Sequence, residues 1–346
     1  MTRSTVLLES HHELPQPRCD FYDRMLISTA AILVGLPLLF WGADRLVIGA
    51  AATARNLGIS AVLVGLIVVG FATSAPEMLI SALASMGNAP GLAVGNALGS
   101  NIANLGLVLG VAVIICPLAV HPQTLRREFP AVVAVTILAT VLLLDSDLSR
   151  IDAFLLLGAL VAMTIWIIAV GSRSSVFDPI RSEYEDDMPP DMPPKTATFW
   201  LILGLVTVLI GAELMVEGAT EIALLLGVSE LVLGVTIVAV GTSLPELAVA
   251  IAGATKGESD LVLGNVLGSN IFNLLAVVGI AGVIEPHMLE RGVVTLHLPL
   301  MGGLTVAVFL FAYNSAMRVQ LTRPIGILLL GTFLTYQGFV VWDALM

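Results

Sequence analysis

Two glutamates lie inside long apolar segments of the chain. Glu77 follows "TSAP" at 73–76 and Glu246 follows "TSLP" at 242–245, so both acids end a TSxPE motif. A carboxylate within an apolar medium is costly unless it is paired or neutralised, and it is therefore a functional hypothesis by default. The alternative is a protonated glutamate that is hydrogen-bonded between helices. Because the flanking residues carry oxygen atoms, we expect Glu77 and Glu246 to form the centre of a site.

The residues beside the glutamates supply neutral oxygen atoms. Pro76 and Pro245 have no amide hydrogen, so each breaks a helical hydrogen bond and releases a carbonyl near Ala72 or Gly241. Unwound backbone at membrane depth is tolerated only where it lines a cavity or packs within protein. The hydroxyl groups that adjoin these carbonyls belong to Thr73, Ser74, Thr242 and Ser243. We expect a cluster of oxygen ligands.

A second pair of segments carries amide and hydroxyl side chains in phase. Residues spaced i, i+4 and i+8 share one face of a helix. The residues with this spacing are Asn96, Ser100 and Asn104 in one segment and Asn265, Ser269 and Asn273 in the other. Helix packing alone does not explain six such residues aligned in apolar helices, so we expect them to face the glutamates.

Glycines accompany both polar faces. Gly95 with Gly99, and Gly264 with Gly268, are small residues at four-residue spacing. Such pairs allow two helices to approach closely in a membrane. Packing is therefore a sufficient explanation for the glycines.

An oxygen-only set of ligands suits a hard cation. Ca²⁺ takes about six to eight oxygens and prefers carboxylates with carbonyls. One Ca²⁺ neutralises two ionised glutamates, and two Na⁺ or two protons do so equally well. An empty site would leave two like charges in low dielectric, which is strongly disfavoured. If the carrier reorients only when it is neutralised, ions cross by replacing one another, so obligatory antiport follows as a hypothesis. Ca²⁺ and Na⁺, with H⁺ as the alternative, are the expected transported ions, and no cofactor is expected.

The composition requires a membrane around these elements. Hydrophobic residues make up 57% of the 346 residues, charged residues only 12%, and mean hydropathy is +0.98. A water-soluble fold could not cover so much apolar surface. Segments long enough to cross a bilayer of roughly 30 Å recur along the chain. The ten expected spans are 26–52, 60–86, 91–115, 129–145, 151–171, 197–221, 229–255, 260–283, 293–313 and 324–342. This pattern predicts an all-α integral membrane protein.

The chain repeats itself at a constant shift in residue number. "TSAPE" at 73–77 returns as "TSLPE" at 242–246, and "GNALGSNIANL" at 95–105 returns as "GNVLGSNIFNL" at 264–274. The shift from Thr73 to Thr242 equals the shift from Gly95 to Gly264, and we call it the repeat offset. Five spans fall in each half, and an odd number makes the second copy enter the membrane from the opposite side. We therefore expect two inverted five-helix repeats, the plan of many secondary transporters.

The polar stretches divide the chain into four parts. An acidic run with five prolines between the halves is interpreted as a solvated tether; a weak peripheral cation site is the alternative. Because much of the net charge of −11 lies there and in other loops, it gives no case for a nucleic-acid partner. The expected parts are a polar N-terminal extension at 1–24, a first repeat at 25–171, the linker at 172–196 and a second repeat at 197–346.

Basic residues predict the orientation in the membrane. Lysine and arginine gather in cytoplasmic loops. Loops after even-numbered spans hold only Arg150 and Arg291, whereas those after odd-numbered spans hold Arg55, Arg126, Arg127, Arg173, Arg181, Lys195, Lys256, Arg318 and Arg323. Odd loops are then cytoplasmic and both termini external, and the expected location is the inner or plasma membrane of the cell. The bilayer and inorganic cations are the expected partners; no protein partner is evident.

The doubled TSxPE and GNxxGSNIxN motifs resemble the two signature repeats of the sodium/calcium exchangers in the cation/calcium exchanger superfamily, and the compact prokaryotic members above all. The resemblance covers nearly the whole membrane part. It implies a ten-helix inverted-repeat fold with four cation sites around the two glutamates, and exchange of three Na⁺ for one Ca²⁺. The ligands that it implies are Glu77, Glu246, Thr73, Ser74, Thr242, Ser243, Ser100, Ser269, Asn104, Asn273 and the backbone carbonyls near Gly70 and Ala239.

The sequence departs from the family pattern in two respects. Some members have an aspartate where Asn273 stands, which bears on the charge of the central site and on the stoichiometry. The linker is also too short for the large cytoplasmic calcium-sensing domains of animal exchangers.

Three other functions compete with sodium-coupled exchange. A proton-coupled Ca²⁺/cation antiporter of the same superfamily is the runner-up, although such proteins usually carry a different glutamate motif. A cation channel could use the same oxygens without a counter-ion. An intramembrane enzyme would need a further group beside the carboxylates, and the sequence offers no membrane-embedded histidine, cysteine or paired aspartates. We therefore expect a secondary transporter and no enzyme.

Overall fold

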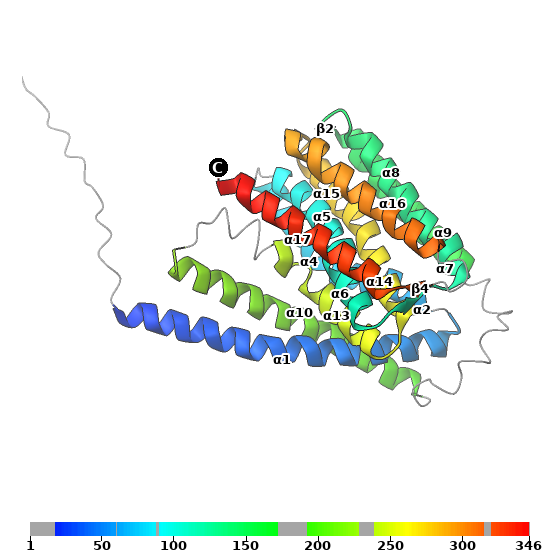
Figure 1. Ribbon diagram of the computed structural model, residues 1–346, viewed down its shortest axis with the longest axis horizontal. Helices are drawn as coiled ribbons and strands as arrows, with labels where there is room; N and C mark the ends of the chain where they lie inside the picture. Colours follow the sequence, from blue (N-terminus) through cyan, green and yellow to red (C-terminus); the bar gives the residue numbers. More distant parts are fainter. Residues whose placement is uncertain are drawn as a thin grey trace, which may run out of the picture.

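The computed structural model describes residues 18–59, 61–87, 90–171, 192–227, 239–314 and 320–345 (Figure 1). Helices account for most of these residues, and short two-residue strands join helices at their ends. Of the four expected parts of the chain, residues 1–17 of the N-terminal extension and 172–191 of the linker lie outside the described residues.

Residues 18–171 form the elements of the first half. Its helices are α1 (Arg18–Leu57), α2 (Ala61–Leu63), α3 (Gly70–Thr73), α4 (Ala75–Met86), α5 (Pro90–Ala103), α6 (Leu109–Ile115), α7 (Pro122–Arg126), α8 (Glu128–Leu143) and α9 (Arg150–Gly171). Its π-helical segments are η1 (Val64–Val69) and η2 (Asn104–Val108), and its strands are β1 (Leu118–Ala119) and β2 (Asp147–Leu148).

The second half follows the same plan. Its helices are α10 (Pro194–Leu225), α12 (Ala239–Gly241), α13 (Leu244–Thr255), α14 (Ser259–Phe272), α15 (Val278–Ile284), α16 (Leu298–Asn314) and α17 (Arg323–Leu345). Its π-helical segments are η7 (Asn273–Val277) and η8 (Val293–His297), and its strands are β3 (His287–Met288) and β4 (Gln320–Leu321).

Elements of the two halves begin at equivalent residues. The first residues of α4 and α13, α5 and α14, η2 and η7, α6 and α15, and β1 and β3 are each separated by the repeat offset. A π-helical segment has wider turns than an α-helix and often occurs at functional sites. Both η2 and η7 begin at an asparagine that the sequence predicts to be a ligand, so the local irregularity repeats together with the motif.

The α1 and α10 helices pack side by side along their length, and α1 also packs against α13 (Figure 1). Glycines recur every seven residues on both, at Gly35, Gly42 and Gly49 and at Gly204, Gly211 and Gly218. A Cβ on Gly204 would lie 2.3 Å from the Leu46 nitrogen, and one on Gly42 would lie 2.7 Å from the Val208 nitrogen. The two backbones therefore approach so closely that only glycine fits.

The middle of the bundle is formed by α5 with α6 and by α14 with α15. In the most apolar 18 residues of these two stretches 72% and 83% are buried, against 22% and 17% in the corresponding windows of α1 and α17. The poorly buried helices nevertheless carry large apolar side chains on their exposed faces, among them Leu26 and Leu33. An apolar outer face of this kind suits lipid, so the more polar α5 and α14 are shielded in the interior.

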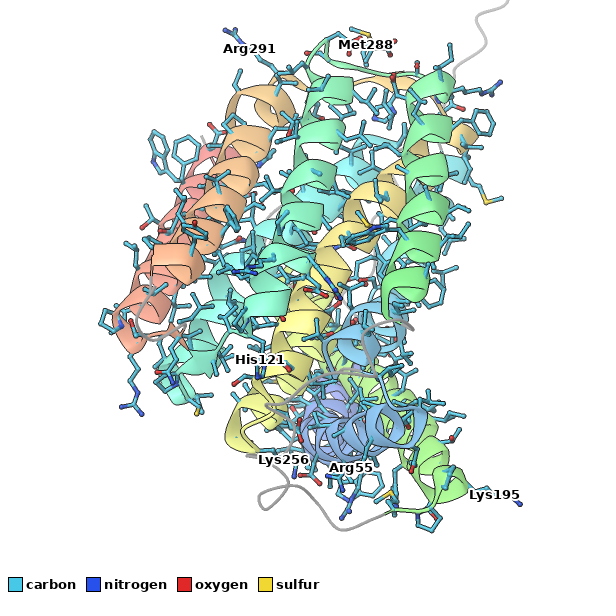
Figure 2. All side chains as sticks on the ribbon, turned by 90° about the vertical axis from the view of Figure 1, so that its right-hand side faces the viewer. Arg55, His121, Lys195, Lys256, Met288 and Arg291 are labelled. Carbon is cyan, nitrogen blue, oxygen red and sulfur yellow. The ribbon has the colours of Figure 1, made fainter. Side chains whose placement is uncertain are left out.

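The strands join the two halves at both ends of the bundle. Strand β1 pairs antiparallel with β4, and β2 pairs antiparallel with β3. In Figure 1, β2 and β4 lie at opposite ends of the helix bundle. Figure 2 shows Met288 and Arg291 at one end, and His121, Arg55, Lys195 and Lys256 at the other. The loop after β1 and the equivalent loop after β3 therefore lie at opposite ends.

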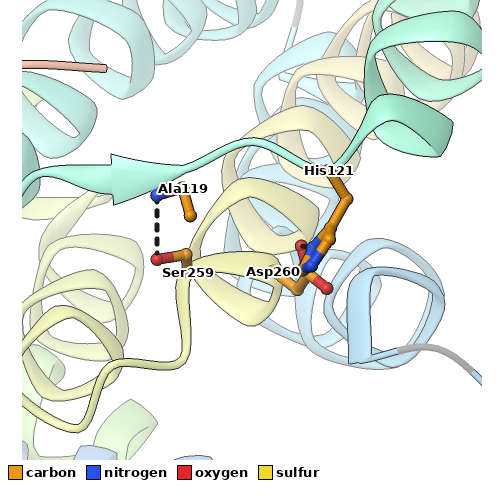
Figure 3. A network of polar contacts seen from close by, with 4 residues as sticks. All are labelled: Ala119, His121, Ser259 and Asp260. Carbon is orange, nitrogen blue, oxygen red and sulfur yellow. Dashed lines mark hydrogen bonds and ion pairs between the residues drawn. The ribbon is translucent and has the colours of Figure 1, made fainter. Parts of the chain in front are cut away.

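A small polar network links the two halves at the end of the bundle that holds Arg55, Lys195 and Lys256, which we call the basic end (Figure 3). The Ser259 hydroxyl accepts a hydrogen bond from the Ala119 amide at 3.2 Å, and His121 Nδ1 lies 2.7 Å from an Asp260 carboxylate oxygen. Ser259 and Asp260 are in the first turn of α14, where a negative side chain complements the helix dipole. The loop after β1 is thereby fixed to the start of a central helix of the other half.

Described helices lie at the positions of the expected spans, but residue 60 of the span at 60–86 and residues 229–238 of the span at 229–255 lie outside the described residues. Six described helices are long and apolar enough to cross a membrane, and the bent pair Val64–Thr73 and Ala75–Met86 makes a seventh. The predicted first span at 26–52 is longer in the structure, because α1 includes residues 18–24 of the expected polar extension and Arg24 forms an ion pair with Glu221 of α10. Ten spans remain a prediction.

Candidate functional site

Both TSxPE motifs interrupt their helices at the serine. Between α3 and α4, Ser74 has φ −84° and ψ 1°; between α12 and α13, Ser243 has φ −90° and ψ 5°. Pro76 and Pro245 stand in the first turns of α4 and α13, where the missing amide hydrogen costs little. The first break bends the helix by 41°. The predicted discontinuity is confirmed in both motifs.

The two glutamates are fully enclosed. Glu77 on α4 is 0% exposed and Glu246 on α13 is 1% exposed. Both oxygens of Glu77 and Oε2 of Glu246 have no hydrogen-bond donor among the described residues. Since a buried unpaired charge is strongly unfavourable, these three oxygens are suited to hold a cation.

Glu246 is contacted by hydroxyl groups of both halves. Ser269 Oγ donates to Glu246 Oε1 at 3.3 Å, and Thr73 Oγ1 lies 3.3 Å from Ser269 Oγ. Thr73 Oγ1 also donates to Asn265 Oδ1 at 3.4 Å. Thr73 belongs to the first motif and Glu246 to the second. The structure thus brings the two TSxPE motifs together, as expected from the sequence.

The other predicted side chains are buried as well. Ser100 and Asn104 from α5 and η2, and Ser269 and Asn273 from α14 and η7, are all buried. Several of the predicted ligands have buried oxygens without a partner in the described part of the chain: Ser74 Oγ, Ser100 Oγ, Ser243 Oγ, Asn104 Oδ1 and Asn273 Oδ1. An unsatisfied buried polar atom costs about 1–3 kcal/mol, so such a concentration favours an occupant that supplies positive charge.

The remaining predicted ligands are Thr242 and the backbone carbonyls of Gly70 and Ala239. Thr242 is buried next to Ser243. The carbonyl oxygen of Gly70 accepts hydrogen bonds from the Ser74 amide at 3.1 Å and from the Thr73 hydroxyl at 3.5 Å. Ala239 begins α12, one turn before Ser243. Asn96 is only half-buried, unlike its equivalent Asn265, which donates to the Glu246 carbonyl at 3.4 Å.

The two glycine pairs differ in the neighbours that the structure describes around them. A Cβ on Gly264 or Gly268 would lie 2.3 Å from a backbone carbonyl oxygen of Val62 or Leu66, which confirms the predicted close approach there. At Gly95 and Gly99 a Cβ would meet nothing within 4 Å among the described residues. The close helix approach is therefore confirmed at the second pair. At Gly95 and Gly99 it stays a prediction, because Leu231 and Val235, the equivalents of Val62 and Leu66, lie outside the described residues.

Three residues near the site were missed by reasoning from the sequence. Asn101 Nδ2 donates to the Asn270 backbone oxygen at 3.2 Å, and Asn104 Nδ2 donates to Asn270 Oδ1 at 3.1 Å. Ser81 Oγ donates to the Val277 carbonyl in η7 at 2.8 Å. Asn101 and Asn270 follow the predicted Ser100 and Ser269 in both repeats, and that recurrence was the available signal.

The site contains the ligand chemistry of a hard cation. Its oxygens come from two carboxylates and from hydroxyl and amide groups, and no cluster of three or more His, Cys, Asp or Glu suited to a metal occurs among the described residues. Ca²⁺ and Na⁺ accept such mixed oxygen sets, whereas softer metals favour sulfur and imidazole.

Comparison with known proteins identifies the family. The family model described as sodium/calcium exchanger protein matches residues 27–169 and 196–342, one stretch in each half. The chain belongs to the sodium/calcium exchanger family. This confirms the resemblance noted from the doubled motifs. Membership also places the protein among membrane transporters of Ca²⁺ and Na⁺ and not in a class of enzymes.

Several relatives match this chain over nearly their full length. CaxA of Alkalimonas amylolytica, named a putative antiporter, is 43% identical over 313 residues, covering 90% of this chain and 98% of the relative. The inner membrane protein YrbG of Escherichia coli (strain K12) is 37% identical, covering 93% of this chain and 97% of its own. A solved structure of the sodium-calcium exchanger NCX_Mj superposes with a TM-score of 0.79 at 34% identity, covering 90% and 97% of the two chains.

Proposed function

We propose that the protein exchanges Ca²⁺ for Na⁺ across the cell membrane by alternating access to one mid-membrane site. The observation that carries this proposal is the pair of enclosed glutamates, Glu77 and Glu246, whose carboxylate oxygens have no donor in the described part of the chain except at Glu246 Oε1. Family membership and the likeness to NCX_Mj, a sodium-calcium exchanger by name, support it.

The ligands of this proposal are the residues expected from the sequence. Glu77 and Glu246 bind Ca²⁺ between them, and Thr73, Ser74, Thr242, Ser243, Ser100, Ser269, Asn104, Asn273 and the carbonyls of Gly70 and Ala239 complete the cation sites. The enclosed oxygens without donors support the assignment. With Asn273 neutral, the two glutamates supply −2, which Ca²⁺ balances; a third Na⁺ then makes exchange electrogenic.

The exchange requires a frame that exposes one site to both faces. We propose ten membrane spans in two inverted repeats, with the loops after odd-numbered spans in the cytoplasm and both termini external. The elements that start one repeat offset apart and the opposite placement of equivalent loops support the inversion. The gathering of Arg55, Lys195 and Lys256 at one end supports the orientation (Figure 2).

Uptake of ⁴⁵Ca into proteoliposomes tests the proposed function. The vesicles contain Na⁺, K⁺ or an acid buffer, and the proposal expects uptake only with internal Na⁺. Uptake with an acid interior would instead support proton coupling, and calcium flux without any counter-ion would support a channel. Glu77→Gln and Glu246→Gln each remove one carboxylate charge from the site and are expected to abolish sodium-driven uptake. Glu290→Gln, at an exposed loop position, is the matched control and is expected to retain uptake.

A further inference from the structure

Two asparagines at equivalent positions of the repeats contact each other. Asn101 on α5 and Asn270 on α14 are separated by the repeat offset, and both are buried. Asn101 Nδ2 donates to the Asn270 backbone oxygen at 3.2 Å. Equivalent residues of two repeats related by a two-fold axis can touch only next to that axis. Asn101 and Asn270 therefore lie where the two halves meet, one residue beyond Ser100 and Ser269.

The hydrogen bonds around this pair are one-sided. Asn104, a proposed ligand of the first half, donates from Nδ2 to Asn270 Oδ1 at 3.1 Å. Its equivalent, Asn273, has neither side-chain atom bonded within the described residues. Thus one of the two ligand asparagines is held and the other is not, although their local sequences are nearly identical.

The unpartnered atoms match the bonds that are missing on the other side. Exchanging the roles of the halves would turn the two observed bonds into Asn270 Nδ2 to the Asn101 backbone oxygen and Asn273 Nδ2 to Asn101 Oδ1. Asn270 Nδ2, Asn273 Nδ2 and Asn101 Oδ1 are all buried without a partner in the described part of the chain. The mirrored set would satisfy all three of these atoms, and it would release Asn104.

We propose that Asn101 and Asn270 are positioning residues with two alternative hydrogen-bond sets, one for each facing state of the exchanger. In the state described here Asn270 holds Asn104, and in the state open to the opposite face Asn101 holds Asn273. The held amide is fixed through its nitrogen, which leaves its oxygen directed at the cation. This inference rests on the proposed exchange function, and it assigns each ligand asparagine to one facing state.

A methionine biases the pair toward the observed set. Met301 Sδ on α16 accepts a second, weak hydrogen bond from Asn101 Nδ2 at 3.6 Å. The equivalent residue is Val132 on α8, and Pro130 and Pro299 show that the repeat offset still holds here. Valine has no acceptor for Asn270, so the extra contact exists for the observed set alone.

The Michaelis constant for Ca²⁺ at each membrane face tests the proposal. Sodium-driven ⁴⁵Ca transport is measured in vesicles of a single protein orientation, first inward and then with the gradients reversed. Asn270→Ala removes the acceptor of Asn104, and Asn101→Ala removes the acceptor of Asn273. Each variant is expected to raise the KM for Ca²⁺ at one membrane face by roughly three- to tenfold, which corresponds to the loss of one hydrogen bond. The face that is affected should differ between the two variants.

The outcomes separate this inference from the proposed function. A wild-type protein without sodium-driven uptake overturns the proposed function itself. A wild-type protein that exchanges, with variants that change KM equally at both faces or at neither, overturns the positioning role alone, because a merely structural defect has no preferred face. If an alanine variant does not fold, the glutamine variant at that position, which keeps the amide but shifts it by one methylene, is measured under the same criteria.

A milder substitution tests the bias. Met301→Leu retains a buried apolar side chain but removes the sulfur acceptor. The KM at the face where Asn101→Ala raises KM should then fall relative to the KM at the other face, measured as the ratio of the two KM values. Thr305→Val, one turn further along α16, removes only a hydroxyl that is bonded to the Met301 carbonyl and is the control. An unchanged ratio of the two KM values in Met301→Leu would contradict the assigned bias.

Discussion

The two halves of the protein carry nearly the same motifs in different surroundings. Glu246 receives a hydrogen bond from Ser269 and lies among Thr73 and Asn265, whereas Glu77 has no donor among the described residues. Gly264 and Gly268 lie against the backbone of Val62 and Leu66, whose equivalents in the second half, Leu231 and Val235, lie outside the described residues. The difference between the two carboxylates shows that equivalent residues of the two repeats are held by different hydrogen bonds.

The largest effect is expected at the glycines. Gly268→Ala places a Cβ 2.3 Å from the Leu66 carbonyl oxygen, so the backbones must separate. Overpacking of this kind costs about 1–3 kcal/mol, and the melting temperature in detergent should fall. Gly99→Ala, the equivalent change, places a Cβ that meets no described residue within 4 Å, so a smaller loss is expected there. An equal fall in melting temperature in both variants would show that the two halves are packed alike at these glycines.

A smaller difference is expected between the two serines. Ser269→Ala removes the donor to Glu246 Oε1, and a hydrogen bond as long as 3.3 Å contributes no more than the typical net value of about 0.5–1.5 kcal/mol. Ser100→Ala removes a hydroxyl that has no partner among the described residues. Without Ca²⁺, the melting temperature should therefore fall only for Ser269→Ala. With saturating Ca²⁺, the stabilisation by the ion should be reduced in both variants; an undiminished shift in Ser100→Ala would exclude that serine as a ligand.

The polar network at the basic end sharpens the comparison further. His121 and Asp260 pair at 2.7 Å, and the equivalent positions in the other half are Glu290 and Gly91, which cannot form such a pair. Because both partners are partly exposed, His121→Ala should lower stability by no more than about 1 kcal/mol. The Asp260→Asn variant should give a similar loss, and the double variant should not add to it. Fully additive losses would mean that the two side chains do not interact.

The smallest effect concerns pH. Burial, followed by the nearby Asp260, raises the pKa of the Glu258 carboxyl above its ordinary value of 4.5. In the pH window between the ordinary and the raised pKa, the folded protein binds more protons than the unfolded chain, so stability falls as pH rises through that window. Glu258→Gln should remove this part of the pH dependence, as followed by melting temperature against pH. A steeper decline in the variant would contradict the sign. The equivalent position, Ala89, has no group that titrates.

Much of the candidate site was predictable because its chemistry is local. Pro76 and Pro245 lack the amide hydrogen that a helix needs, so the breaks at Ser74 and Ser243 follow from the residue types alone. The four-residue spacing of Ser100 and Asn104 placed them on one face of a helix. The hydrogen bonds of Asn101 and Asn270 were not predictable, because a contact across the interface of two repeats has no spacing signature within either one.

The sequence by itself determined the membrane setting, the doubling of the motifs and the residue types that gather around the glutamates, since apolar runs, proline breaks and helical periodicity act within one segment of chain. Only the tertiary structure decided that Thr73 reaches Ser269 beside Glu246 and that Asn104 is held while Asn273 is not. The reason is physical: two equal sequences must share one interface, and a close-packed interface admits a single set of hydrogen bonds at a time.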